Sequence, residues 1–88
     1  MEAKIIKDEK ENLIIEMDNQ TVAELLRVYL NKEDAVEMAA WKRENAYKPV
    51  VLEIKTSGKS ARKVLEDAAD AIEKESSKYM EDFKKALK

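Results

Sequence analysis

The segment Thr56-Ser57-Gly58-Lys59-Ser60 is the first candidate for chemistry, because its Gly-Lys-Ser ending is also that of a phosphate-binding loop. In such a loop, backbone N–H groups surround the phosphates and the lysine ammonium neutralises them. The full motif also requires a glycine five residues before the Gly-Lys pair, but that position holds Glu53 and the chain has 1 glycine in total. We therefore interpret the segment as a turn, with Ser60 as the N-cap of a following helix.

Acidic side chains are the second candidate, since paired carboxylates can act as general acid and base. The chain has 19 Asp and Glu residues but no His and no Cys, so catalysis would need a carboxylate or lysine whose pKa is shifted by burial or neighbours. The spacing instead predicts solvated helix faces, and Asp70 and Lys74 are spaced as an ordinary exposed ion pair. We expect no catalytic, cofactor-binding or metal-binding residues. A small enzyme using buried carboxylates remains an alternative.

Trp41 is the third candidate, because Lys42 and Arg43 follow it and could form a stacking site for single-stranded nucleic acid with it. No second aromatic residue lies on the same face of the predicted strand. The 17 basic and 19 acidic residues give a net charge of −2, whereas nucleic-acid-binding domains usually carry a basic face. We interpret Trp41 as a core or interface residue and expect no nucleic-acid or anionic membrane partner. A nucleic-acid module remains a further alternative.

The size of the chain bounds its organisation. Its 88 residues suffice for a single domain, residues 1–88, which buries only roughly 60–65% of the surface of the unfolded chain. Without cysteine or histidine, oligomerisation is the support left open for so thin a core. No apolar run approaches the roughly 20 residues of a membrane span, and the charged start Met1–Lys4 is unlike a signal peptide. We therefore expect a cytoplasmic protein.

Four short runs rich in branched residues predict β-strands. The polar residues between the first two runs are few enough for a hairpin connection. In the last run, apolar residues at every second position indicate one buried face. The predicted strands are Ala3–Asp8, Leu13–Met17, Val36–Lys42 and Pro49–Thr56.

A capping box predicts the start of the first helix. Thr21 can accept a hydrogen bond from the third helical N–H group while Glu24 reaches back to the Thr21 N–H group. We predict a helix from Val22 to about Leu30, with Asn31 as its C-terminal stop, because asparagine tolerates the left-handed conformation common at helix ends. Its apolar residues fall on one stripe: Val22, Leu25, Leu26, Tyr29 and Leu30.

The second predicted helix runs from Ala61 almost to the end of the chain. At about 27 residues it would be about 40 Å long, whereas a domain of this size is only about 25 Å across. We therefore expect its last two turns to project from the domain with Tyr79, Met80 and Phe83. An apolar stripe beyond the core requires a partner.

These elements predict an α+β fold of order ββαββα, with both helices on one face of a four-stranded sheet and a long C-terminal helix. The two apolar helices exceed what four short strands can cover, so part of their surface should meet another protein. The predicted interface residues are Val22, Leu25, Leu26, Tyr29, Leu30, Ile72, Tyr79, Met80 and Phe83.

Short segments along nearly the whole chain also form an ordered set. They are Lys4–Lys7 with Asn12-Leu13, the helix start Thr21–Arg27, Val36 with Ala39–Trp41, Lys48-Pro49 with Ile54–Thr56, and Gly58-Lys59 before the last helix. In this order and spacing the set resembles archaeal DNA-directed RNA polymerase subunit L, a member of the small α-like subunit family. The chain departs from the family at Gln20, where a His is usual, and at Val22–Glu24, where Leu-Ala-Asn is common. The shorter loop Arg43–Lys48 also lacks the family's His-Pro-Leu sequence.

The resemblance implies a function in transcription. A member of this family would pair through helices with the D-type subunit of RNA polymerase, and the pair would be the platform for the large catalytic subunits. Catalytic magnesium and nucleotide addition would belong to those large subunits of the nucleotidyltransferase. The leading alternative is a self-pairing α+β regulatory module unrelated to polymerase, and a homodimer is possible for the isolated chain.

Overall fold

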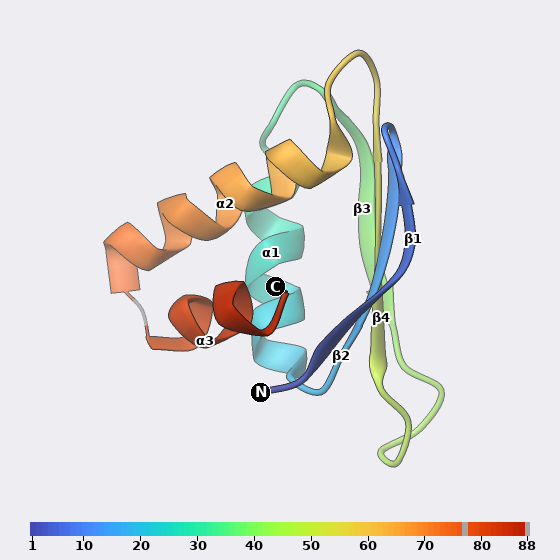
Figure 1. The fold of residues 1–88 in the computed structure, drawn as a ribbon, viewed down its shortest axis with the longest axis vertical. Coiled ribbons are helices and arrows are strands. Elements are labelled where there is room, and N and C mark those ends of the chain that lie inside the picture. The colour runs from blue at the N-terminus through green and yellow to red at the C-terminus, as the bar shows by residue number, and fades with distance from the viewer. Residues whose placement is uncertain (77, 88) are drawn as a thin grey trace.

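The computed structural model of the chain describes residues 1–76 and 78–87, without the side chains of residues 76, 78 and 79. The predicted α+β class is confirmed, and the strand bounds differ from the predicted ones by at most one residue. Figure 1 shows the arrangement of the elements. In chain order these are β1 (Ala3–Glu9), β2 (Asn12–Met17), α1 (Gln20–Leu30), β3 (Val36–Lys42), β4 (Val50–Thr56), α2 (Ala61–Ser76) and α3 (Lys78–Ala86).

The four strands form one antiparallel sheet in the order β1-β2-β4-β3. The register places Ile15 of β2 opposite Ile5 of β1 and Leu52 of β4, and Leu52 opposite Trp41 of β3. Residues opposite one another share a face of the sheet, so these four side chains form one row. The row lies on the face toward the helices, where Ile15 and Leu52 are fully buried.

All three helices lie on the same side of the sheet (Figure 1). The core lies between these two layers, because alternate residues of the central strands point toward the helices. The buried strand residues are Leu13, Ile15, Met17, Val50, Leu52 and Ile54. Their neighbours Ile14, Glu16, Val51 and Glu53, on the other face, are half-buried.

The first helix begins earlier than the capping box predicted. Asn19, not Thr21, is the N-cap: its side-chain oxygen accepts a hydrogen bond from the Val22 N–H group at 3.1 Å. Asn19 has the extended conformation of a cap residue, with φ −125° and ψ 104°, as the chain leaves β2. Thr21 is therefore already helical, and Glu24 is free to bond elsewhere.

Asn31 ends this helix as predicted, but in the right-handed conformation, with φ −70° and ψ −8°. The left-handed conformation that asparagine tolerates is therefore not what ends this helix. The side chain of Asn31 has a different task, because it accepts a hydrogen bond from the Ala39 N–H group at 3.2 Å and donates one to the Ala39 carbonyl at 3.0 Å. This pair of bonds holds the end of α1 against β3.

The predicted single C-terminal helix is two helices, and this is the main correction to the predicted fold. Beyond α2, α3 turns back beneath it rather than projecting from the domain (Figure 1). Met80 and Phe83 are 0% exposed, so the chain's own core covers two of the apolar residues that the prediction assigned to a partner. Burial of such side chains contributes about 1.5–3 kcal/mol each, which favours the folded-back arrangement.

Charged groups also hold α3 against α2. The Lys84 ammonium of α3 pairs with the Asp70 carboxylate of α2, and it lies 3.7 Å from the Glu73 carboxylate. The hydrogen bond from Lys84 lowers the pKa of Asp70, and the same bond raises the pKa of Lys84. Asp70 therefore pairs with Lys84, whereas its spacing had predicted a pair with Lys74.

Candidate functional site

The segment that ends in Gly-Lys-Ser is a turn. Gly58 has a left-handed φ of +82°, and its N–H group donates to the carboxylate of Glu11. A carboxylate thus occupies a donor that a bound phosphate would need. The Thr56 hydroxyl donates to the Lys59 carbonyl at 2.6 Å, and the Ser60 hydroxyl accepts from the Lys63 N–H group at 3.2 Å. The prediction of a turn with Ser60 as N-cap is confirmed.

Trp41 joins the sheet to the first helix. It is half-buried, and its indole N–H group donates to the Glu24 carboxylate at 3.0 Å. Arg27 donates two hydrogen bonds of 2.7 Å to the same carboxylate. The bonds from Arg27, and then the bond from Trp41, lower the pKa of Glu24 to about 2. Glu24 is therefore ionised at neutral pH, and it links α1 to β3 rather than exchanging protons.

Neither a metal site nor a membrane span is found in the part of the chain that the structure describes. Within residues 1–76 and 78–87, no group of three or more Asp and Glu side chains is placed to hold a metal ion. Among the helices described, none is both long and apolar enough to cross a membrane.

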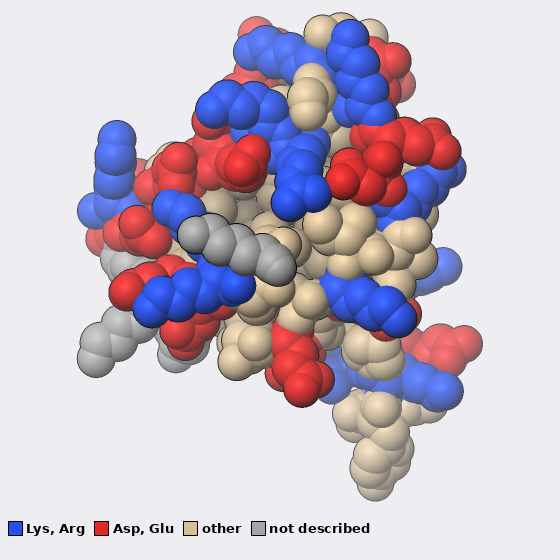
Figure 2. Space-filling view, in the orientation of Figure 1, with Lys and Arg blue, Asp and Glu red and all other residues tan. Residues whose placement is uncertain are grey.

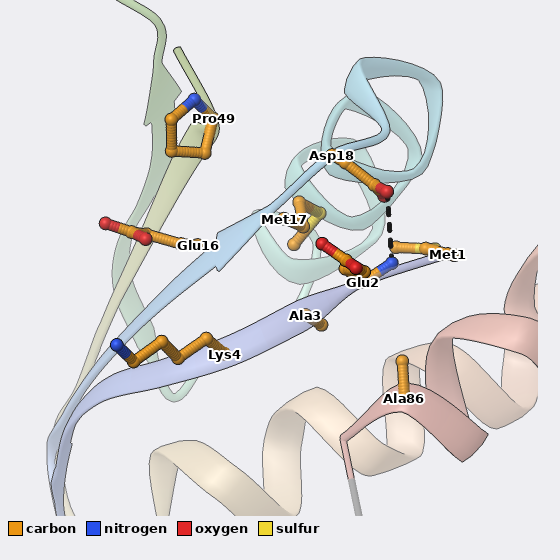
Figure 3. A pocket seen from close by; sticks show the side chains of 9 residues that line it. All are labelled: Met1, Glu2, Ala3, Lys4, Glu16, Met17, Asp18, Pro49 and Ala86. Atoms are coloured by element: carbon orange, nitrogen blue, oxygen red, sulfur yellow. Dashed lines mark hydrogen bonds between the residues drawn. The ribbon is translucent and has the colours of Figure 1, made fainter.

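The surface has an open hollow between the N-terminus and the end of α3. Figure 3 shows Met1, Ala3 and Ala86 around it, with Lys4 and Glu16 projecting away from them. The Glu2 N–H group donates to the Asp18 carboxylate at 3.1 Å, a bond that fixes the start of β1. Since the charged groups do not converge, this hollow offers no polar centre for a ligand.

The structure places the predicted interface residues in three groups. Six are at most 1% exposed within their own chain, two are half-buried, and the side chain of Tyr79 lies outside the described residues. The half-buried residues are Leu25 and Tyr29 of α1. Contact with a partner stays a prediction for all nine residues. The fully buried residues are Val22, Leu26, Leu30, Ile72, Met80 and Phe83.

The apolar side chains that α1 and α2 leave at the surface form what we call the outer helix face: Leu25, Val28, Tyr29, Ala68 and Ala71. Val28 is 38% exposed and Ala71 is also exposed. Tyr29, Ala68 and Ala71 line a shallow groove between the two helices. The sequence-based interface lacked Val28, Ala68 and Ala71. The signal in the sequence was a branched apolar residue, Val28, on the side of α1 opposite its buried stripe.

Tyr29 is held in place on this face. Its hydroxyl donates to the Glu75 carboxylate of α2, and this hydrogen bond raises the pKa of Tyr29. The Lys32 ammonium lies 4.8 Å from the centre of its ring. An ion pair between Glu33 and Lys59, at 3.4 Å, lies on the rim of the groove. An apolar strip with a polar rim is the usual arrangement of a protein–protein interface.

The comparison with protein families shows what kind of domain carries this surface. A sequence model described as the RNA polymerase Rpb3/Rpb11 dimerisation domain matches residues 11–82. The chain belongs to this family. The matched range includes β2 and all of α1 and α2, and therefore the whole outer helix face. Membership of the Rpb3/Rpb11 family makes the chain a polymerase assembly subunit of the dimerising type.

A solved structure has the same fold as this family member. The crystal structure of DNA-directed RNA polymerase subunit L from Thermoplasma acidophilum superposes with a TM-score of 0.74, at 16% sequence identity. The match covers 94% of this chain and 85% of that chain. No curated protein sequence matches the chain. The resemblance to the polymerase subunit family predicted from short segments is thus confirmed.

Proposed function

We propose that this chain is a non-catalytic assembly subunit that forms a heterodimer with the D-type subunit of RNA polymerase. The pair would be the platform on which the large catalytic subunits assemble, in the cytoplasm. Membership of the Rpb3/Rpb11 dimerisation family supports a role in polymerase assembly. The identity of the partner and the platform role come from the sequence resemblance.

The observation that carries the proposal is the outer helix face. Val28, at 38% exposure, is an apolar side chain on the side of α1 away from the core, and Leu25 and Ala71 flank the same surface. Each large apolar side chain that a partner buries contributes about 1.5–3 kcal/mol. In this proposal Leu25, Val28 and Tyr29 contact the D-type subunit directly.

The buried residues of the predicted interface have a supporting role in this arrangement. Val22, Leu26 and Leu30 lie under the outer helix face and fix the position of α1 on the sheet. Met80 and Phe83 would reach the D-type subunit only after α3 had left its place in the core. The substitution Leu26→Asp would therefore unfold the chain, so it cannot test pairing.

A surface variant tests pairing without disturbing the core. The chain and the D-type subunit of the same cell are co-expressed, and the mass of the product is measured by light scattering after size-exclusion chromatography. We expect a one-to-one complex for the wild type and loss of that complex for Val28→Glu. The matched control is Ile6→Glu on β1, a branched apolar side chain that is 49% exposed but lies on another element.

The same experiment separates the rival function. A wild-type chain that forms a homodimer and does not bind the D-type subunit would contradict the polymerase pairing and favour the self-pairing regulatory module. Equal loss of the complex in Val28→Glu and Ile6→Glu would refute the outer helix face as the contact surface.

A further inference from the structure

The loop between β3 and β4 presents an aromatic side chain to solvent at one end of the molecule. Tyr47 is 97% exposed, whereas Met1, Ile6 and Val28 are 38–49% exposed. Figure 1 shows the loop extending beyond the sheet, and at this lower end Figure 2 shows uncharged atoms at the tip. Single exposed apolar side chains are common on proteins, so this exposure needs a second observation before it indicates a site.

The second observation is that hydrogen bonds fix the shape of this loop. The Asn45 side-chain oxygen accepts from the Tyr47 N–H group at 2.8 Å, and the Asn45 carbonyl accepts from the Lys48 N–H group at 3.1 Å. The Arg43 guanidinium donates to the Ala46 carbonyl at 3.0 Å and to the Lys48 carbonyl at 2.9 Å. The side chains of Asn45 and Arg43 thus satisfy backbone groups of the turn, and Tyr47 is the aromatic side chain that the turn exposes.

This fixed shape lowers the cost of binding through Tyr47. A partner does not have to order the loop, because Asn45 and Arg43 have already done so on folding. A third nitrogen of Arg43 lies 3.5 Å from the side-chain oxygen of Gln20, the first residue of α1, which connects the base of the loop to the helix layer. Loops held by a rigid scaffold in this way commonly carry binding residues.

The charges around Tyr47 indicate the chemistry of its partner. The segment 42–49 contains Lys42, Arg43 and Lys48 but only Glu44 as an acidic residue, in a chain whose net charge is −2. Tyrosine and arginine are enriched among the residues that dominate interface binding energy. A complementary pocket would be apolar at its base, to bury the ring, and acidic at its rim.

We propose that the β3–β4 loop is a second protein-docking element, in which Tyr47 inserts into an apolar, acid-rimmed pocket of a large polymerase subunit. This inference rests on the proposed function, because a platform subunit must contact a third protein besides its dimer partner. In Figure 1 the tip of the loop lies below both α1 and α2, the two helices that carry the outer helix face. Pairing through the outer helix face therefore leaves Tyr47 accessible.

The test has two steps, each with its own readout. First, the one-to-one complex with the D-type subunit is purified for the wild type, Tyr47→Ala, Tyr47→Phe and the control Ile6→Ala. Each complex is then titrated with each purified large polymerase subunit of the same cell, and affinity is measured by biolayer interferometry. We expect every variant to pair with the D-type subunit. At the second step we expect Tyr47→Ala to bind one large subunit about 30-fold more weakly, the effect of losing an interface hot spot.

The other variants separate the ring from the hydroxyl and from general surface effects. Tyr47→Phe keeps the ring and should stay within about threefold of the wild type, as should Ile6→Ala. Tyr47→Ala binding every large subunit as tightly as the wild type would overturn the docking element while leaving the heterodimer intact. A wild-type chain that does not pair with the D-type subunit at the first step would overturn the proposed function and this inference with it.

Discussion

The folded-back position of α3 can be tested with Phe83→Ala in the isolated chain. Phe83 is 0% exposed, between α3 and the sheet, and it lines an open pocket together with Leu13, Ile15 and Leu65. Truncation of a buried Phe costs about 3–5 kcal/mol, because it removes buried apolar contacts and leaves a cavity. A domain of this length has a free energy of unfolding of about 4–13 kcal/mol, so a loss of this size would be a substantial share of its stability.

The assay is urea unfolding followed by far-UV circular dichroism and Trp41 fluorescence. With a slope of about 1.5 kcal/mol per M, a loss of about 3 kcal/mol lowers the midpoint by about 2 M. Tyr47→Ala is the matched control, because this aromatic residue is 97% exposed and its truncation should change stability by no more than about 0.5 kcal/mol. Met80→Ala, also 0% exposed, should lose about 2–5 kcal/mol and repeats the test on another side chain.

The result distinguishes two arrangements of the C-terminal helix. If α3 projected from the domain, Phe83 would contact little of its own chain, and Phe83→Ala would behave like the control. A midpoint shift below about 0.5 M for both Phe83→Ala and Met80→Ala would refute the packing described above and restore the projecting helix that the apolar stripe predicted.

Three further predictions test single contacts. Asn19→Ala should cost about 1 kcal/mol of stability, and Thr21→Ala much less, because Asn19 is the N-cap; urea unfolding measures both, and the reverse order would restore the capping box. Gly58→Ala should cost about 1–2 kcal/mol from its φ of +82° alone, since no atom lies within 4 Å of the added methyl group, and a neutral result would contradict this backbone conformation. Because the folded-state pKa of Glu24 lies below its ordinary value of 4.5, its contribution to stability is present above that value and is lost as the pH falls toward about 2. Glu24→Gln should therefore lose less stability than the wild type over that pH range, and an NMR midpoint for Glu24 near 4.5 would exclude the bonds to Arg27 and Trp41.

Local sequence patterns could predict the elements whose signal lies within one short segment. The strands follow from alternation, as in Val50, Leu52 and Ile54, and α1 follows from a stripe at helical spacing. The stripe that continues through Met80 and Phe83 gave the wrong tertiary structure, because spacing shows that residues will be buried but not whether their own chain buries them.

The candidate site was predicted only in part for the same reason. Leu25 and Tyr29 lie on the outer helix face, as an interface requires, but Leu26 belongs to the same stripe and is 0% exposed. Which edge of an apolar stripe faces outward depends on how α2 crosses α1, and no local pattern contains that angle. The start of α1 could not be predicted for a similar reason. Asn19 and Thr21 are both good N-cap residues, and the place where the chain leaves β2 determines which of them caps the helix.

The strand order has a consequence for synthesis of the chain. The central pair joins β2 to β4, so that Leu13 lies opposite Ile54, a residue made much later. At about 5–20 residues per second, β2 has an unpaired edge for some seconds after the β1–β2 hairpin can form. That edge belongs to the apolar run Leu13-Ile14-Ile15, the type of segment that pairs wrongly with other chains. Glu11 and Glu16 on either side of the run supply the charge that opposes such pairing until β4 arrives.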